Sequence, residues 1–163
     1  MDYLWAPWRI EYIKKAKEEG CILCQKPAEA DDDANYILFR GQKNFVIMNS
    51  YPYNAGHLMV APYRHVAGLD ELTDEELVEH YKLVRQSVLV LKQVFQSEGF
   101  NIGMNLGRVA GAGVDKHLHT HIVPRWGGDI NFMPVIADIK VVNEALGESY
   151  QKLRCGFYPG RGK

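Results

Sequence analysis

His117-Leu118-His119-Thr120-His121-Ile122-Val123 is the stretch that decides the fold, because three histidines alternate with other residues along it. Alternate side chains of a β-strand share one face, so we predict a strand over 117–123 whose three imidazoles are about 6.5 Å apart along it. A buried imidazole needs hydrogen-bond partners, and packing alone does not explain three of them. Two interpretations remain open: the histidines bind a metal, or one is a nucleophile and the others donate hydrogen bonds to a charged substrate.

A glycine-rich loop, residues 107–113, precedes this strand. Glycine lets a backbone approach a ligand closely, so the N–H groups around Gly111 and Gly113 can reach phosphate oxygens. Such a loop alone is weak evidence. Joined to a three-histidine strand, it favours the nucleophile over the metal.

Further short apolar runs surround the histidine strand. Four of them indicate strands, over 36–40, 45–48, 57–61 and 100–106. The short turn at 41–44 favours antiparallel pairing. We therefore predict an α+β fold built on a mainly antiparallel sheet of about five strands.

Two helices complete the predicted fold. Thr73 and Glu76 form a capping-box signature at the start of a long helix, which is predicted to end near Gly99. His80 lies on this helix and is predicted to be exposed. The apolar stripe of this helix, interpreted as core, consists of Leu77, Tyr81, Val84, Val88, Leu91 and Phe95. A C-terminal helix is predicted over 138–153. Its core-facing residues are expected to be Ile139, Val142, Leu146, Tyr150 and Leu153.

The composition is that of one folded domain. Of 163 residues, 47% are hydrophobic and 24% charged, so the chain can bury a core. We predict a single domain over 1–163, in which residues 1–35 form an N-terminal appendage. A formal net charge of −1 argues against a protein that coats nucleic acid or an anionic membrane. The odd cysteine count, with no secretory signal or membrane-spanning run, predicts a cytoplasmic protein.

The appendage carries a Cys-x-x-Cys pair, Cys21 and Cys24. The pair is half of a zinc site, a redox pair, or incidental. A redox pair of the thioredoxin kind is expected within a βαβ pattern, which this sequence lacks. A zinc site needs two further ligands. The remaining cysteine, Cys155, lies far along the chain, so histidines are the better candidates.

The histidine stretch resembles the motif of the histidine triad (HIT) family, with Thr120 in a position that is usually apolar. Residues 49–62 and 101–107 are also similar to segments of that family. Residues 121–129 are similar to the branch that contains diadenosine tetraphosphate phosphorylases and fragile histidine triad hydrolases. The resemblance covers residues 4–154. It implies a HIT-like fold and an enzyme acting on a dinucleoside polyphosphate or a related adenylyl compound.

Within this resemblance, His117, His119 and His121 are the candidate catalytic residues. His119 matches the nucleophile that attacks an α-phosphorus and forms a nucleotidyl-histidine intermediate. Its other ring nitrogen is expected to donate to a backbone carbonyl, while His121 hydrogen-bonds the phosphate or the leaving oxygen. Substrate-binding positions of the family fall on Asn49 for the ribose, Asn105 for the phosphate chain, and His57 near the base and phosphate.

Two features of the substrate site stay open. Phe45, Ile47 and Leu58 either sandwich the base or belong to the core. Many members carry Gln, Ser or Thr just before the triad, whereas this chain has Ala112-Gly113-Val114. Backbone N–H groups can take over the phosphate contact there, but the leaving-group preference is not defined.

The resemblance also implies a structural zinc site and a two-fold homodimer. Some branches hold zinc through residues that match Cys21, Cys24, His65 and His117 here. This zinc would tie the appendage to the histidine strand. No catalytic metal is expected, although a polyphosphate substrate is expected to bring Mg²⁺.

Several functions are compatible with these residues. Water as the final acceptor makes the enzyme a hydrolase, and inorganic phosphate makes it a phosphorylase. The resemblance of residues 125–129 favours a phosphorylase. The alternatives are an adenylyl phosphoramidate hydrolase of the same family, a non-catalytic nucleotide sensor, and a three-histidine metalloenzyme.

Overall fold

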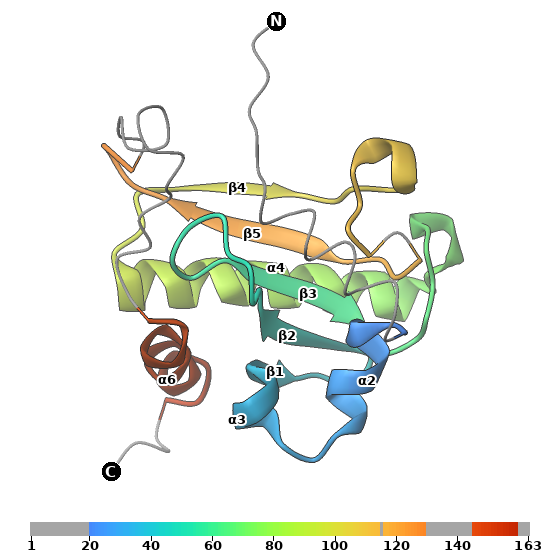
Figure 1. Cartoon of the computed structure of the whole chain (residues 1–163), viewed down its shortest axis with the longest axis horizontal. Coiled ribbons are helices and arrows are strands. Elements are labelled where there is room, and N and C mark those ends of the chain that lie inside the picture. The colour runs from blue at the N-terminus through green and yellow to red at the C-terminus, as the bar shows by residue number, and fades with distance from the viewer. Residues whose placement is uncertain (1–19, 115, 130–144, 160–163) are drawn as a thin grey trace, which may run out of the picture.

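The computed structural model describes residues 20–114, 116–129 and 145–159, and one five-stranded antiparallel sheet forms its centre (Figure 1). The strands are β1 (Ile37–Arg40), β2 (Asn44–Met48), β3 (Leu58–Pro62), β4 (Gly99–Gly103) and β5 (Thr120–Arg125). They lie in the order β1-β2-β3-β5-β4, and every neighbouring pair is antiparallel. The predicted α+β fold with a mainly antiparallel sheet is confirmed.

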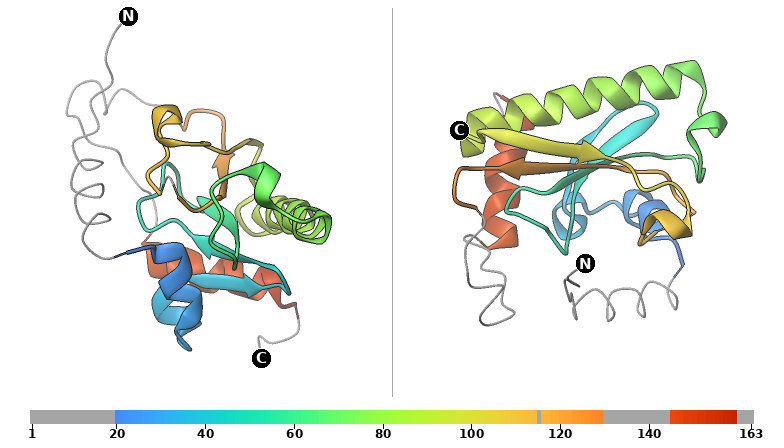
Figure 2. Two further views of the ribbon diagram at one scale, coloured as in Figure 1. Left: turned by 90° about the vertical axis from the view of Figure 1, so that its right-hand side faces the viewer. Right: turned by 90° about the horizontal axis from the view of Figure 1, so that it is seen from above.

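Helices lie on both sides of this sheet. The long helix α4 (Asp74–Phe95) runs along one face, and α2 (Ile22–Ala28) lies on the other side (Figure 2). The C-terminal helix α6 (Leu146–Phe157) packs against α4 and β1. Shorter elements are α3 (Asp32–Asn35), η1 (Leu69–Glu71) and η2 (Arg108–Ala110). No helix in the described ranges combines the length and the apolar character that crossing a bilayer requires.

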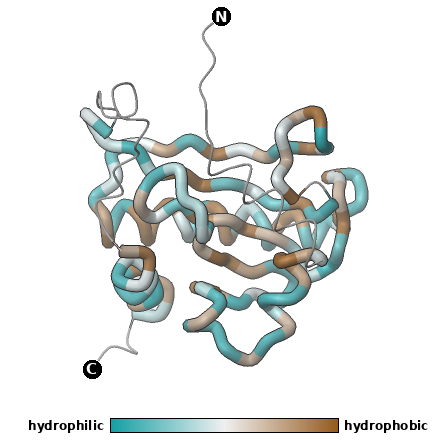
Figure 3. The backbone as a smooth tube through the Cα atoms, in the orientation of Figure 1, coloured by the Kyte–Doolittle hydropathy of each residue, from teal (hydrophilic) through white to brown (hydrophobic). Residues whose placement is uncertain are grey.

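Both faces of the central strands are buried, because β2 and β3 alternate their side chains between two cores. One core joins Leu23 of α2 to Phe45, Ile47, Met59 and Ala61. The other lies under α4 and α6 and includes Val46, Met48, Leu58 and Val60. The brown, apolar stretches of the tube in Figure 3 follow these central strands. Part of the predicted appendage is thus packed on the sheet through α2.

The start of α4 confirms the predicted capping box, but the end of the helix and its buried face differ from the prediction. The Thr73 hydroxyl accepts from the Glu76 backbone N–H, and the Glu76 carboxylate accepts from the Thr73 N–H. The helix ends at Phe95, where Gln96 takes the left-handed conformation with φ 52°, and Gly99 instead begins β4. Tyr81 of the predicted stripe is 53% exposed. The buried face is rotated toward His80, Leu83 and Ser87, because it covers polar groups of the sheet as well as apolar ones.

The other boundaries also shift. β4 stops at Gly103 instead of reaching 106, and α6 runs on to Phe157. The start of the predicted C-terminal helix, 138–144, lies outside the described residues. β5 begins at Thr120 and continues through Pro124. Proline is tolerated there because β3 pairs only as far as Ile122, so the missing N–H interrupts no hydrogen bond to β3.

Candidate functional site

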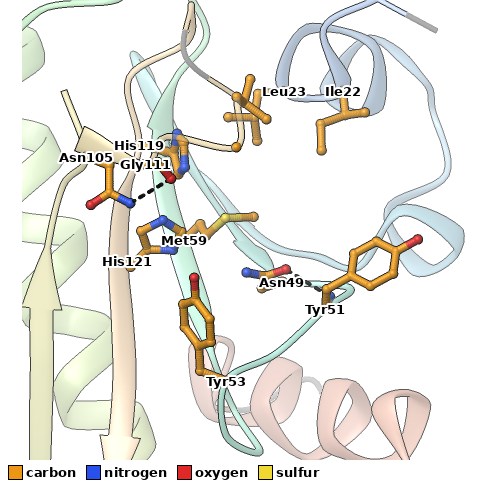
Figure 4. A pocket seen from close by; sticks show the side chains of 12 residues that line it. Ile22, Leu23, Asn49, Tyr51, Tyr53, Met59, Asn105, Gly111, His119 and His121 are labelled. Atoms are coloured by element: carbon orange, nitrogen blue, oxygen red, sulfur yellow. Dashed lines mark hydrogen bonds between the residues drawn. The ribbon is translucent and has the colours of Figure 1, made fainter. Parts of the chain in front are cut away.

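Two histidines of the triad line one pocket at the start of β5. The ring centroids of His119 and His121 are 4.7 Å apart, and their planes are inclined by 78° (Figure 4). His117 does not line this pocket, because its ring contacts the cysteines near α2. The two cysteines lie at the start of α2, which also supplies Ile22 and Leu23 to the pocket, so the His117 ring lies on the same side of the sheet as those of His119 and His121.

A hydrogen bond assigns the ring proton of His119. Its Nδ1 lies 2.8 Å from the backbone carbonyl oxygen of His117, which can only accept, so Nδ1–H donates. The lone pair is then on Nε2. The side chain is 5% exposed, and burial lowers the pKa of His119, although the bond to the His117 carbonyl opposes this shift. His119 therefore offers a neutral imidazole nitrogen, the form that can act as a nucleophile.

A second chain of hydrogen bonds orients His121. The backbone N–H of Tyr53 donates to Nδ1 of His57 over 3.1 Å, so the proton of His57 is on Nε2. That Nε2 lies 3.0 Å from Nδ1 of His121, which accepts, and the proton of His121 is therefore on its own Nε2. His57 is fully buried, and the Tyr53 ring stacks on it with centroids 5.0 Å apart. His57 thus acts by orienting the ring of His121.

The polar part of the pocket contains most of the predicted substrate-binding residues. Asn49, Asn105, Gly111 and Gly113 line it together with His119 and His121. The amide nitrogen of Asn105 donates to the Gly111 carbonyl over 3.4 Å. Gly111 has φ 85°, which glycine adopts without the strain that a Cβ would bring. Figure 4 shows Asn105 beside the two histidines, with Asn49 on the far side of His121.

An apolar wall closes the pocket, and none of its residues was predicted from the sequence as a binding residue. The wall consists of Ile22, Leu23, Tyr51, Tyr53, Met59 and Val114. The earlier candidates for contact with the base lie elsewhere: Phe45 and Ile47 belong to the core under α2, and Leu58 to the core under α4. One signal was available. Ile22 and Leu23 stand between the two cysteines, so a cluster that joins those cysteines to His117 also brings them to the triad.

The four predicted metal ligands lie together at one site. The sulfur atoms of Cys21 and Cys24 and the ring nitrogens of His65 and His117 are all within 4.8 Å of one another. His117 Nδ1 is 3.2 Å from Cys21 Sγ, 3.3 Å from Cys24 Sγ and 3.3 Å from His65 Nδ1. Cys24 Sγ is 3.2 Å from His65 Nδ1.

The chemistry of this donor set fits a tetrahedral zinc ion. Zinc bonds of about 2.1 Å to nitrogen and about 2.3 Å to sulfur give ligand–ligand edges of roughly 3.4–3.8 Å, close to the separations in the cluster. His117 Nε2 donates to the Pro62 carbonyl over 2.8 Å, which leaves the lone pair of Nδ1 directed at the cluster. Such an outer hydrogen bond is the usual way in which a metal-binding histidine is oriented.

His80 was predicted to be exposed, and this prediction is wrong. The side chain is fully buried, with Nδ1 2.9 Å from Asn44 Oδ1 and Nε2 2.6 Å from Thr120 Oγ1. Burial lowers the pKa of His80 to about 4, and the charge of a protonated His119 would add to this effect. The sequence carries no local sign of these contacts, because the partners lie 36 and 40 positions away.

Comparison with known proteins agrees with this geometry. Residues 31–128 match the HIT domain family. Over 161 residues the chain is 39% identical to "AP-4-A phosphorylase" of Mycobacterium tuberculosis, covering 94% of this chain and 83% of that protein. Over 95 residues it is 35% identical to a bis(5'-nucleosyl)-tetraphosphatase of Schizosaccharomyces pombe, covering 58% of this chain and 52% of that protein.

A solved structure shares the fold. It is a zinc-bound histidine triad family protein from Mycobacterium smegmatis, 21% identical, with a TM-score of 0.68 and coverage of 86% of this chain and 94% of that one. The family match spans more than half of the sequence and includes the three histidines and the sheet that holds them. The chain belongs to the HIT domain family.

Proposed function

We propose that this protein cleaves dinucleoside polyphosphates such as diadenosine tetraphosphate by transferring a nucleotidyl group first to His119 and then to inorganic phosphate. The observation that carries the proposal is the pair of fixed tautomers in one pocket. His119 presents an unprotonated Nε2, and His121, 4.7 Å away between ring centroids, presents a protonated one. The similarity to the mycobacterial phosphorylase supports phosphate as the acceptor.

In the first step, Nε2 of His119 attacks an α-phosphorus of the substrate. A P–N bond forms, the bond from that phosphorus to the bridging oxygen breaks, and ATP leaves. We expect His121 Nε2–H to hydrogen-bond the departing oxygen or the α-phosphate. Because the His117 carbonyl already accepts from Nδ1, it stabilises the positive charge that develops on the His119 ring.

In the second step, a phosphate oxygen attacks the same phosphorus. The P–N bond breaks and ADP is released, which returns His119 to its neutral form. The division of one displacement into two is the general advantage of a covalent intermediate. We expect Asn105 and the backbone of Gly111 and Gly113 to contact the phosphate chain, and Asn49 to contact a ribose, because all four residues line the pocket.

The apolar wall suits a purine base. Ile22, Leu23 and Met59 provide aliphatic surface, and Tyr51 is 45% exposed at the mouth of the pocket. Bases bind well between apolar or aromatic side chains. The base would therefore lie against α2.

We assign the cluster of Cys21, Cys24, His65 and His117 to a structural zinc ion. The tetrahedral separations and the oriented lone pair of His117 support this assignment. When bound, zinc links α2 to the segment before β5. In this proposal the ring of His117 holds the metal, whereas its carbonyl orients His119, so His117 has no direct part in the chemistry.

The reaction is tested by incubating the full-length protein with diadenosine tetraphosphate, with and without inorganic phosphate, and identifying the products by mass. We expect ADP and ATP only when phosphate is present, and no turnover by His119→Ala. AMP and ATP without phosphate would show a hydrolase instead. Tight nucleotide binding without turnover in either condition would refute an enzyme and favour a sensor. Repeating the assay without Mg²⁺ tests whether the substrate needs that ion.

The zinc assignment is tested by elemental analysis of the purified protein. We expect one zinc per chain in the wild type, and loss of that zinc in Cys24→Ser. Cys155→Ser is the matched control, because this exposed cysteine lies outside the cluster. Equal zinc content in all three proteins would refute the assignment.

Two properties implied by the family are kept as part of this proposal. We expect a two-fold homodimer, which light scattering of the purified protein measures directly. We also expect the protein in the cytoplasm, which fractionation of the source cells tests.

A further inference from the structure

A fully buried histidine has no part in the proposed chemistry, yet it contacts the active strand. His80 projects from α4 and bonds the hydroxyl of Thr120, the residue between His119 and His121. Thr120 is itself 1% exposed and pairs with Val60 of β3. Its side chain points toward α4, whereas its two neighbours point into the pocket.

The partners of His80 define the direction of each hydrogen bond. The amide nitrogen of Asn44 donates to the Glu76 carbonyl and to the Glu79 carboxylate, at 3.0 and 3.1 Å, so Oδ1 of Asn44 faces His80. Nδ1–H of His80 therefore donates to this oxygen, and Nε2 accepts from the Thr120 hydroxyl.

Glu79 holds Asn44, the residue at the other end of this chain of hydrogen bonds. The Glu79 carboxylate also accepts from the backbone N–H groups of Gln42, Lys43 and Asn44, at 2.7, 2.6 and 2.7 Å. Asn44 is fully buried. Hydrogen bonds to a charged carboxylate are short and strong, so Asn44 gives His80 a rigid support.

We propose that His80 is a positioning residue, which fixes the Thr120 hydroxyl and thereby the backbone from which His119 and His121 enter the pocket. This inference rests on the proposed function. The route is short, since one hydrogen bond separates His80 from a residue adjacent to the nucleophile. An attacking atom displaced by about 1 Å can lower a rate on the order of 100-fold, so a small change in the backbone is enough.

Four variants and one control test the proposal by steady-state kinetics. Thr120→Val removes the hydroxyl and keeps the shape, whereas Thr120→Ser keeps the hydroxyl. His80→Asn can reach only Asn44, whereas the longer His80→Gln can present an oxygen to Thr120. The control is Ser87→Ala, because Ser87 is also fully buried on α4 but bonds only the Leu83 carbonyl of its own helix.

We expect kcat to fall about 10–100-fold in Thr120→Val and His80→Asn, with KM changed less than about twofold. Thr120→Ser and His80→Gln should stay within about threefold of the wild type. Because the two residues act as a unit, the double variant Thr120→Val/His80→Asn should be no slower than the slower single variant. An unchanged kcat in Thr120→Val, or an equal loss in Ser87→Ala, would overturn the proposal.

A measurement without turnover separates this inference from the proposed reaction. The ring ¹Hε1–¹³Cε1 NMR signal of His119, assigned with His119→Gln, reports the surroundings of that imidazole. We expect it to move in His80→Asn and to stay in place in Ser87→Ala and His80→Gln. If the wild type shows no turnover, the proposed function fails while this signal still decides whether His80 positions His119. An unmoved signal in His80→Asn would refute the positioning role.

Discussion

Acidification should destabilise this protein through His80, and the effect can be isolated by substitution. His80 is fully buried, and burial lowers its pKa from 6.5 to about 4. In the unfolded chain the imidazole recovers its ordinary pKa, so between these values the unfolded state binds more protons than the folded state. Stability therefore rises with pH through this window and is lost as the pH falls.

The size of the effect follows from the gap between the two pKa values. The folded value is about 4 and the ordinary value is 6.5. At about 1.4 kcal/mol for each pH unit, this gap corresponds to about 3 kcal/mol, of which about 2 kcal/mol is lost between pH 7 and pH 4.5. Glu76 and Glu79 on the same helix have lowered pKa values and contribute mainly at lower pH, while burial gives His119 and His117 a shift in the same direction as His80.

The assay is urea unfolding of the wild type and of His80→Gln across this pH range. The glutamine variant keeps the other titrating groups and removes only the His80 proton, so the difference between the two curves belongs to His80. We expect the wild type to lose about 2 kcal/mol more than His80→Gln between pH 7 and pH 4.5. If the free energies of unfolding of the two proteins changed in parallel with pH, the reasoning would be refuted. That result would mean that His80 binds the same number of protons in the folded and unfolded states.

Two further predictions concern packing and the turn at 42–44. A Cβ at Gly156 of α6 would lie 2.7 Å from Val90 Cγ1, so Gly156→Val should cost about 1–3 kcal/mol in thermal unfolding. Gly147→Ala, in the same helix with nothing within 4 Å of its Cβ, should instead gain a few tenths of a kcal/mol. Glu79→Ala removes the acceptor of three backbone N–H groups and should cost about 2 kcal/mol, with faster hydrogen exchange of the 42–44 amides.

The elements that the sequence predicts well are those whose signals are local. The hydroxyl of Thr73 and the carboxylate of Glu76 are three residues apart, and both capping hydrogen bonds form as expected. Short apolar runs mark β2 and β3 as strands, although they do not reveal that α2 covers the second face of the sheet. The end of α4 is missed because Gln96 adopts a left-handed conformation, a role for which glycine is the usual signal.

The features that the sequence does not predict depend on distant partners. His80 lies three residues after Leu77 and four before Val84, at the edge of the apolar stripe, but its polar side chain gives no local sign of burial. Its burial depends on Asn44 and Thr120, which approach it only once the sheet has formed. The apolar wall of the pocket has the same origin, because Ile22 reaches the triad through the packing of α2.

The first turn of α2 explains how one heptapeptide can serve two sites. Cys21 and Cys24 flank Ile22 and Leu23, so the same helical turn contacts the ring of His117 and forms part of the wall around His119 and His121. Leu118 N–H donates to the Val66 carbonyl, and the ring of His117 reaches Cys21 and Cys24. The same peptide presents its His117 carbonyl to His119. A disturbance of the cysteine cluster should therefore reach the nucleophile in two ways, through the His117 carbonyl and through the pocket residues Ile22 and Leu23 of α2.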